Sequence, residues 1–142
     1  MERIHGTCVA INGDGVLFRG PSGSGKSDLA LRIIDSGGQL VADDQTIITR
    51  KGDRIITSSP ASIRHKIEVR GIGIMTFSAK KEAPLILILD MLLPANIERI
   101  PQVKFCNYLD VKIPVLGFSP FENSATSKVK LAINLVKQFA NK

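Results

Sequence analysis

The chain has 142 residues, of which 44% are hydrophobic and 23% are charged, and its 19 lysines and arginines against 13 aspartates and glutamates give a formal net charge of +6. This length and composition are typical of a globular protein with one hydrophobic core, so we expect one domain, residues 1–142. The longest apolar run, PLILILDMLLP, is interrupted by Asp90, and the first residues lack a continuous apolar segment. Neither a membrane span nor a secretory signal is therefore expected.

The positive charge and the cysteines limit the classes of partner. A net positive charge of this size most often reflects a solvated basic surface. The alternative is that it attracts phosphates or an acidic protein. Nucleic acid is not expected, because tryptophan is absent and no basic stripe carries interleaved aromatic residues. Cys8 and Cys106 have no metal-ligand spacing, which favours buried free thiols in a reducing cytoplasm.

The first part of the chain predicts two strands and a helix. Residues 3–11 predict a strand, and the NGDG turn after it predicts a hairpin into a second strand at 15–20. From 26 to 36, apolar residues recur at helical spacing on one face. Gly37 and Gly38 then predict the end of that helix.

The loop between this strand and helix, GPSGSGKSD, fits the pattern G-x-x-x-x-G-K-[ST]. Glycines let backbone N–H groups approach phosphates, and a helix N-terminus adds positive potential. Lys26 would contact the β- and γ-phosphates, and the Ser27 hydroxyl would bind the bridging Mg²⁺. The alternative is an ordinary Gly/Ser-rich loop, but the flanking strand and helix favour phosphate binding. The predicted nucleotide-binding residues are Gly20, Pro21, Ser22, Gly23, Ser24, Gly25, Lys26 and Ser27.

The remaining segments predict a mixed sheet with few helices. Further strands are predicted at 39–42, 45–50, 54–58, 66–76 and 85–90. LILILD is continuously apolar, as a strand buried on both faces should be. Residues 124–140 predict a helix with Ser124 as its N-cap. Its apolar stripe would be Ala125, Val129, Ala132, Leu135, Val136 and Phe139. We therefore expect an α/β fold in which the helix after the glycine-rich loop packs on a mixed sheet.

Charged residues after two of these strands are candidates for chemistry. Asp43 and Asp44 follow a short apolar strand, where ligands gather in such sheets, although an acidic turn is the alternative. Because neighbouring strand residues point opposite ways, only one of the two is expected to face the site. Glu68 and Arg70 are expected on one face of a strand, where Glu68 would bind a metal ion and Arg70 would neutralise phosphoryl charge. An ion pair on a solvated sheet face is the alternative for these two. His5, taken alone, favours a structural role.

Taken together, these segments resemble the catalytic domain of the HPr kinase/phosphorylase family. The resemblance runs in order from HG at His5 through GPSGSGKS and LVADD to IEVRGIGI, and KIPVLGF at 112–118 resembles the family's Pro-Val segment. It implies a P-loop nucleotide-binding fold similar to that of phosphoenolpyruvate carboxykinase. It also implies a cytoplasmic serine kinase that uses ATP and Mg²⁺ to phosphorylate an HPr-like carrier of the sugar phosphotransferase system, in a hexameric assembly.

The resemblance also implies roles for single residues. One of the two adjacent aspartates would accept the proton of the substrate serine, and the same group would act as the acid when inorganic phosphate reverses the reaction and releases pyrophosphate. His5 would support that carboxylate, and Ser27 and Glu68 would bind Mg²⁺. From the residues and the resemblance together, the catalytic candidates are Asp43, Asp44, His5, Lys26 and Arg70.

Three departures from the family pattern qualify this expectation. The chain starts where longer members have an N-terminal domain before it, which suggests a short form. The family's arginine after the Pro-Val pair is absent, because Leu116 and Gly117 follow Val115. The family's C-terminal helical region is not recognisable either. We therefore expect kinase activity with weak phosphorolysis. The alternatives are an ATP-binding regulatory module that acts through a protein partner and, less favoured, a small-molecule kinase.

Overall fold

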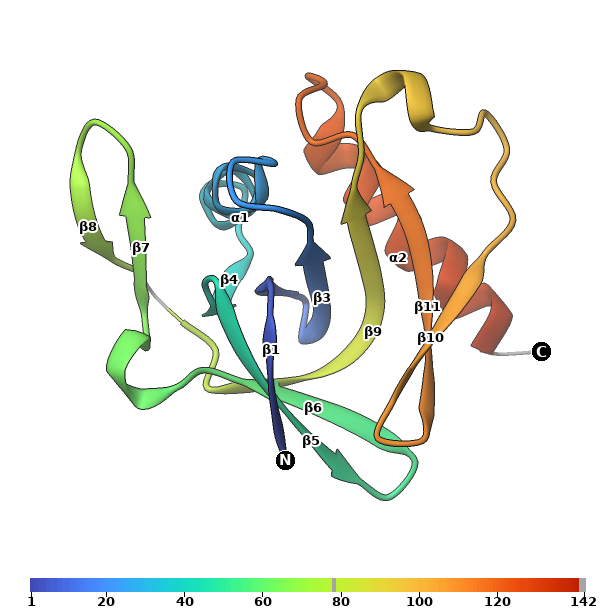
Figure 1. Cartoon of the computed structure of the whole chain (residues 1–142), viewed down its shortest axis with the longest axis horizontal. Helices are drawn as coiled ribbons and strands as arrows, with labels where there is room; N and C mark the ends of the chain where they lie inside the picture. Colours follow the sequence, from blue (N-terminus) through green and yellow to red (C-terminus); the bar gives the residue numbers. More distant parts are fainter. Residues whose placement is uncertain (78, 141–142) are drawn as a thin grey trace.

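The computed structural model describes residues 1–77 and 79–140. Within these residues, the strands form a nine-stranded mixed sheet and a separate two-stranded hairpin, with two α-helices (Figure 1). The strands are β1 (Glu2–His5), β2 (Thr7–Ile11), β3 (Asp14–Arg19), β4 (Gln39–Ala42), β5 (Gln45–Lys51), β6 (Arg54–Ser58), β7 (Lys66–Val69), β8 (Gly73–Thr76), β9 (Glu82–Met91), β10 (Lys104–Tyr108) and β11 (Val111–Phe118). The helices are α1 (Lys26–Asp35) and α2 (Ala125–Ala140), with short 3-10 turns at Ala61–Ile63 and Pro94–Asn96.

The long strand β9 lies at the centre of the main sheet. The order along the sheet is β1-β5-β6-β9-β3-β2-β4, and the hairpin β10-β11 adds to β9 through β11. The first residues of β9 pair antiparallel with β6, and the later ones pair in parallel with β3 and β11. The expected mixed sheet is therefore confirmed, and β9 joins its antiparallel and parallel parts.

Two hydrophobic clusters form the core, one on each face of the central strands. Val16 and Phe18 of β3 pack in the cluster that contains both helices. Leu17, between them, packs on the opposite face with Ile48 of β5 and Ile55 of β6. The antiparallel strands thus fold over the face that the helices leave open, and β3 is buried on both sides. This burial fixes the strand that leads into the glycine-rich loop.

Local turn chemistry behaves as the sequence predicts in two places. Asn12 and Gly13 have φ values of 50° and 84°, and Ile11 pairs with Asp14 across the turn. This left-handed geometry makes a tight hairpin between β2 and β3. At the end of α1, the N–H of Gly37 donates to the carbonyl of Ile34 at 3.1 Å. Both the hairpin and the end of the helix are confirmed.

The single strand predicted at 3–11 is wrong, because the chain breaks at Gly6. The N–H of Gly6 donates to the carbonyl of Asp44 at 2.8 Å, and its carbonyl accepts a hydrogen bond from Thr46 Oγ1 at 3.0 Å. As a result, β1 pairs with β5, whereas β2 pairs with β3 and β4. The break places His5 on a different strand from the core residues that follow it.

The single strand predicted at 66–76 is also two strands. Gly71 and Gly73 have φ values of 87° and 125°, a left-handed geometry that turns the chain back on itself. The hairpin β7-β8 stands to one side of the main sheet in Figure 1. These glycines therefore form the turn between β7 and β8.

The C-terminal third holds the largest differences from the sequence predictions. In α2 the buried stripe includes Ile133, whereas Leu135 and Phe139 are 39% and 47% exposed. The hairpin β10-β11 is not predicted as a unit, because KFCNY lacks a clear apolar alternation.

Cys8 is buried as expected, but Cys106 is partly exposed, and both thiols are free.

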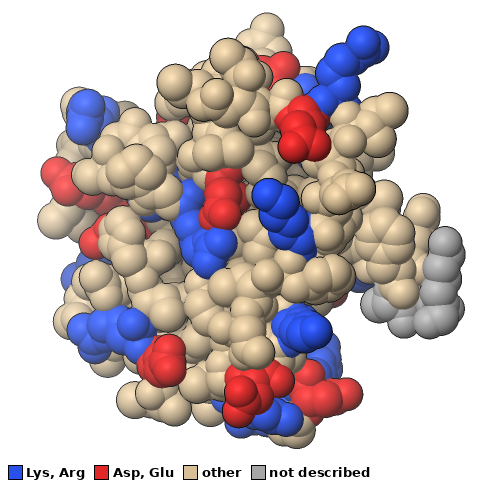
Figure 2. Space-filling model, turned by 45° about the vertical axis from the view of Figure 1, so that its right-hand side comes forward, with Lys and Arg blue, Asp and Glu red and all other residues tan. Residues whose placement is uncertain are grey.

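The surface has no charge concentration on the face shown in Figure 2, where basic and acidic side chains are interspersed. In the described residues, no helix has the length and hydrophobicity that crossing a membrane requires.

Candidate active site

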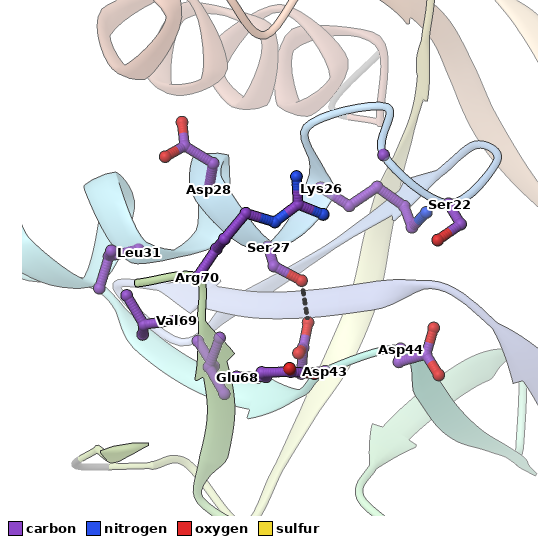
Figure 3. A pocket seen from close by; sticks show the side chains of 12 residues that line it. Ser22, Lys26, Ser27, Asp28, Leu31, Asp43, Asp44, Glu68, Val69 and Arg70 are labelled. Atoms are coloured by element: carbon purple, nitrogen blue, oxygen red, sulfur yellow. Dashed lines mark hydrogen bonds between the residues drawn. The ribbon is translucent and has the colours of Figure 1, made fainter. Parts of the chain in front are cut away.

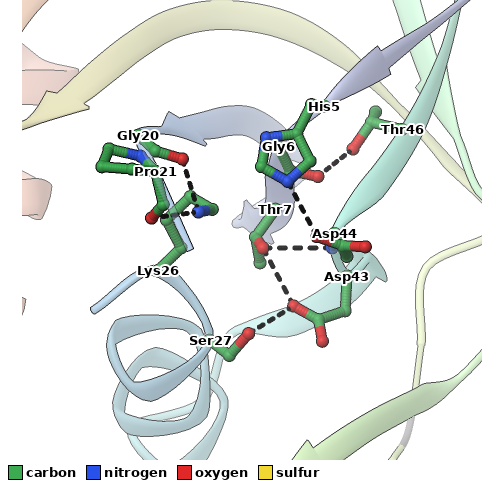
Figure 4. A network of polar contacts seen from close by, with 10 residues as sticks. All are labelled: His5, Gly6, Thr7, Gly20, Pro21, Lys26, Ser27, Asp43, Asp44 and Thr46. Atoms are coloured by element: carbon green, nitrogen blue, oxygen red, sulfur yellow. Dashed lines mark hydrogen bonds and ion pairs between the residues drawn. The ribbon is translucent and has the colours of Figure 1, made fainter. Parts of the chain in front are cut away.

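The glycine-rich loop, residues 20–27, joins β3 to the first turn of α1 and is called the phosphate loop below (Figure 4). A Cβ atom added at Gly20 would stand 2.7 Å from Ser24 Oγ, so a larger residue there would have to displace Ser24. The N–H of Ser24 donates to the carbonyl of Pro21 at 3.1 Å, which closes a tight turn. The loop therefore has the compact backbone that a phosphate-binding loop requires.

Lys26 places its charge inside the phosphate loop. The residue is 7% exposed, and Nζ donates to the carbonyl oxygens of Gly20 at 2.6 Å and Pro21 at 3.0 Å. Among the described residues, no carboxylate forms an ion pair with this ammonium group. A buried cation held only by carbonyl oxygens lacks a counter-charge, and a phosphate in the loop would supply it.

Ser27, Thr7 and Asp43 form a hydrogen-bonded cluster beside the loop (Figure 4). Ser27 Oγ donates to Asp43 Oδ1 at 2.8 Å, and Thr7 Oγ1 donates to the same oxygen at 2.9 Å. Thr7 is fully buried, and its hydroxyl also accepts a hydrogen bond from the N–H of Asp44 at 3.2 Å. Asp43 is therefore fixed against the loop from two sides.

Asp44 points to a different partner. Its Oδ1 lies 2.9 Å from Nε2 of His5, which comes from β1. The strand β4 has ended at Ala42, and Asp44 has a φ of 66°, so strand alternation no longer applies. Both aspartates line the same cavity, and the prediction that only one faces the site is wrong.

The cavity beside the phosphate loop has a volume of about 610 Å³ and brings together residues from distant parts of the chain (Figure 3). Glu68 of β7 and Arg70 line it together with the loop and the two aspartates. Arg70 lies in the turn after β7, not on the strand face shared with Glu68 as predicted. Figure 3 shows its guanidinium extending toward the loop that carries Lys26. In the described part of the chain, Glu68 and Arg70 form no ion pair with each other.

The oxygen atoms in this cavity suit a hard divalent cation. Ser27 supplies a hydroxyl and Asp43 and Glu68 supply carboxylates, and Mg²⁺ prefers such ligands. Among the described residues, no group of three or more acidic, histidine or cysteine side chains is arranged as a metal site. Few protein ligands are what Mg²⁺ needs when phosphates and water complete its shell. The residues therefore fit Mg²⁺ bound together with a nucleotide.

A second polar cluster holds the strand that leads into the phosphate loop. Arg19 forms two hydrogen bonds with Asp90 at the end of β9, at 2.7 Å and 2.9 Å, and a third with the hydroxyl of Tyr108 at 3.1 Å. The hydrogen bonds with Asp90 raise the pKa of Arg19, and burial raises the pKa of Tyr108. The cluster ties β3, β9 and β10 together next to the loop.

Thr7 and Asp90 are the site-supporting residues that sequence reasoning missed. A signal for Thr7 existed, since it is the one hydroxyl residue at the start of an apolar strand, directly after HG. Asp90 ends an apolar strand, as the aspartates at 43 and 44 do, but the sequence alone indicates only that it interrupts a long apolar run.

The fold and this cavity define an α/β protein with a phosphate-binding loop of the kind found in nucleotide-binding proteins. A model of the family described as HPr Serine kinase C-terminal domain matches residues 1–84. The chain therefore belongs to this family.

Curated relatives named HPr kinase/phosphorylase show where the similarity lies. The protein from Exiguobacterium sp. is 49% identical over 76 residues, which cover 53% of this chain and 24% of the relative. The protein from Chlorobium limicola is 33% identical over an alignment of 156 positions that covers 99% of this chain and 47% of the relative. The chain thus spans less than half the length of these relatives.

A solved structure extends the similarity of the fold to the whole chain. The Hpr(Ser) kinase/phosphatase from Coxiella burnetii superposes with a TM-score of 0.88 at 22% identity, and the match covers 100% of both chains. At this identity the likeness concerns the fold alone. It includes the C-terminal region beyond residue 84, where the family match ends.

Proposed function

We propose that the chain is a serine protein kinase that transfers the γ-phosphate of ATP, with Mg²⁺, to an HPr-like carrier protein. The observation that carries this proposal is the cavity of about 610 Å³, which joins the phosphate loop to Asp43, Asp44 and Glu68. A protein that only bound phosphate would need the loop but not a carboxylate poised to accept a proton. Membership of the HPr kinase family and the names of the curated relatives support the choice of substrate.

In this proposal Asp44 is the base. Its carboxylate faces the cavity, and the contact of Oδ1 with His5 at 2.9 Å leaves the other oxygen free for the substrate hydroxyl. The serine hydroxyl loses its proton to Asp44 as its oxygen bonds to the γ-phosphorus, and the bond from that phosphorus to the bridging oxygen of ADP breaks. His5 orients the carboxylate and is a positioning residue.

Asp43 has a different role, because its Oδ1 already accepts hydrogen bonds from Ser27 and Thr7. It fixes the Ser27 hydroxyl at the end of the phosphate loop, and Ser27 and Glu68, which line the same cavity, would hold Mg²⁺. When bound, the ion would neutralise charge on the phosphates. Lys26 would exchange its carbonyl partners for phosphate oxygens, and Arg70 would stabilise the transferred group.

The direct test is incubation with labelled ATP, Mg²⁺ and a purified HPr-like carrier. Acid-stable, base-labile label on a serine of the carrier supports the proposal, since phosphohistidine is acid-labile. Lys26→Ala is the negative control for nucleotide binding. Binding of ATP by the wild-type chain without any transfer would instead favour a regulatory module. The hexameric assembly implied by the family resemblance stays a prediction, to be checked by sedimentation of the same preparation.

A further inference from the structure

An exposed aromatic side chain lies against the end of the phosphate loop. Phe121 belongs to the loop between β11 and α2, and it is 61% exposed. Its ring atoms Cε1 and Cζ lie 3.2 Å from the position that a Cβ atom on Gly25 would occupy. Gly25 is the last glycine of the phosphate loop and the N-cap of α1. The ring therefore lies against the loop while most of the residue remains exposed to solvent.

The backbone that carries Phe121 is held in place from α1. The guanidinium of Arg32 donates to the carbonyl of Pro120 and, at 3.5 Å, to the carbonyl of Glu122. These carbonyls stand on either side of Phe121, and Pro120 itself is buried. The Arg32 side chain is in turn paired with Asp28 at 3.2 Å, one turn earlier on the same helix. The ring is therefore presented to solvent on a backbone that α1 holds in place.

The topology places Phe121 on the side of the phosphate loop away from the aspartates. β3, β9 and β11 run parallel, so the loops after them meet at one edge of the sheet. In the sheet, β4 lies on one side of β3, and Asp43 and Asp44 follow β4. The strands β9 and β11 lie on the other side of β3. The transferred phosphate must lie near the aspartates, so the rest of the nucleotide extends the opposite way, along the carboxyl ends of the strands.

We propose that Phe121 is the platform on which the base of the loop-bound nucleotide stacks. The inference rests on the proposed function, because it needs a nucleotide in the phosphate loop. The ligand at this subsite is the aromatic base of a nucleoside triphosphate. A phenyl ring has no hydrogen-bonding group, so it recognises the π-face of the base and not its edge pattern.

Fluorescence gives a direct test, because the chain has no tryptophan. Phe121→Trp introduces a single reporter at the proposed subsite. Phe105→Trp is the matched control, because Phe105 is also 61% exposed but lies on β10 and lines a different cavity. Stacking predicts that Mg-ATP quenches the fluorescence of the Phe121→Trp variant and that Mg-tripolyphosphate does not. Neither ligand should quench the Phe105→Trp variant. Equal responses to both ligands at position 121 would overturn the inference.

Calorimetry separates this inference from the proposed function. Phe121→Ala should weaken ATP binding by about fivefold or more, the range for loss of one base-stacking contact, while tripolyphosphate affinity stays unchanged. Phe105→Ala should change neither affinity. If the wild-type chain binds ATP and tripolyphosphate equally well, or Phe121→Ala lowers both affinities alike, the stacking role is wrong and phosphate binding stands. If the wild-type chain binds neither ligand, the proposed function fails, and this inference fails with it.

Discussion

Two adjacent aspartates at the end of β4 have different neighbours, and the difference comes from one backbone angle. With a φ of 66° at Asp44, the chain turns instead of continuing the strand. The N–H of Gln45 then donates to the carbonyl of Asp43 at 2.7 Å, and both carboxylates reach the cavity. Positive φ at a non-glycine residue is a strained conformation that the surrounding hydrogen bonds must hold. Here the bond from Gly6 to the carbonyl of Asp44 does so.

This separation predicts different effects for the two Asn substitutions. Asp44→Asn should leave ATP affinity unchanged and lower the rate of phosphotransfer by about 10²-fold or more, the usual scale for loss of a general base. Asp43→Asn should instead raise the Mg²⁺ concentration needed for half-maximal rate, because a neutral amide oxygen accepts the Ser27 hydrogen bond more weakly than the carboxylate does and holds that hydroxyl less firmly. Steady-state rates measured across a Mg²⁺ titration distinguish the two. Identical profiles for both variants would contradict the assignment of separate roles.

The buried thiol of Cys8 predicts how the stability of the fold depends on pH. Burial raises the pKa of its thiol from 9.0 to about 12. Between these values the unfolded chain loses the thiol proton and the folded chain keeps it, so stability falls as pH rises through this window. Unfolding by denaturant at pH 8 and pH 10.5 should show a loss of stability that is smaller in Cys8→Ala. Cys106→Ala is the control, since that thiol is partly exposed. An equal pH dependence in Cys8→Ala and wild type would contradict the prediction.

At the scale of the elements, the strand before the phosphate loop depends on the pair between Arg19 and Asp90. Both side chains are about one-third exposed, at 29% and 36%. Asp90→Asn removes the charge while keeping the shape, and it should lower the free energy of unfolding by about 1 kcal/mol, a value reduced for partial solvent screening. Denaturant unfolding of Arg19→Met, Asp90→Asn and the double variant measures the coupling. Strict additivity of the two single effects would show that the pair does not stabilise the fold.

An element could be predicted from the sequence where the residues that cause it are neighbours in the chain. The turn at Asn12 and Gly13 and the end of α1 at Gly37 depend on residues next to each other, and both predictions are confirmed. The break at Gly6 is missed because its cause is distant, in hydrogen bonds to Asp44 and Thr46.

The candidate site follows the same rule. The phosphate loop could be predicted from the spacing of its glycines, lysine and serine. Asp43 and Glu68, which line the same cavity, could be predicted because one follows a predicted strand and the other lies on one. The contact of Thr7 with Asp43 could not, because it requires β2 and β4 to pair, with one bulge in their register. The place of Phe121 against Gly25 likewise depends on the packing of the last loop on α1.

At the scale of the whole molecule, the charge lining the cavity bears on the direction of the reaction. Two cations, Lys26 and Arg70, line it, against four carboxylates. The carboxylates are Asp28, Asp43, Asp44 and Glu68. Where the family resemblance places an arginine, this chain has buried Leu116 and then Gly117, which packs against Leu92. The cavity therefore has little positive charge to spare for a second anion.

We therefore expect the chain to phosphorylate the carrier faster than it reverses the reaction. Reversal requires inorganic phosphate beside a phosphoserine, and two anions in this cavity repel each other at short range. The measurement is pyrophosphate release from the purified phosphoserine carrier in millimolar phosphate, compared with the forward rate. A reverse rate equal to the forward one would show that the missing arginine is unimportant here.

The central place of β9 has a consequence for the order in which the protein can form. The phosphate loop lies at residues 20–27, but β3, which leads into it, is flanked by β9 at residues 82–91. Contacts so distant in sequence slow folding, because the intervening chain must be closed into a loop first. During synthesis on a ribosome, the residues of the phosphate loop emerge long before their supporting strand exists. The loop can acquire its fixed shape only after residues 82–91 have been made.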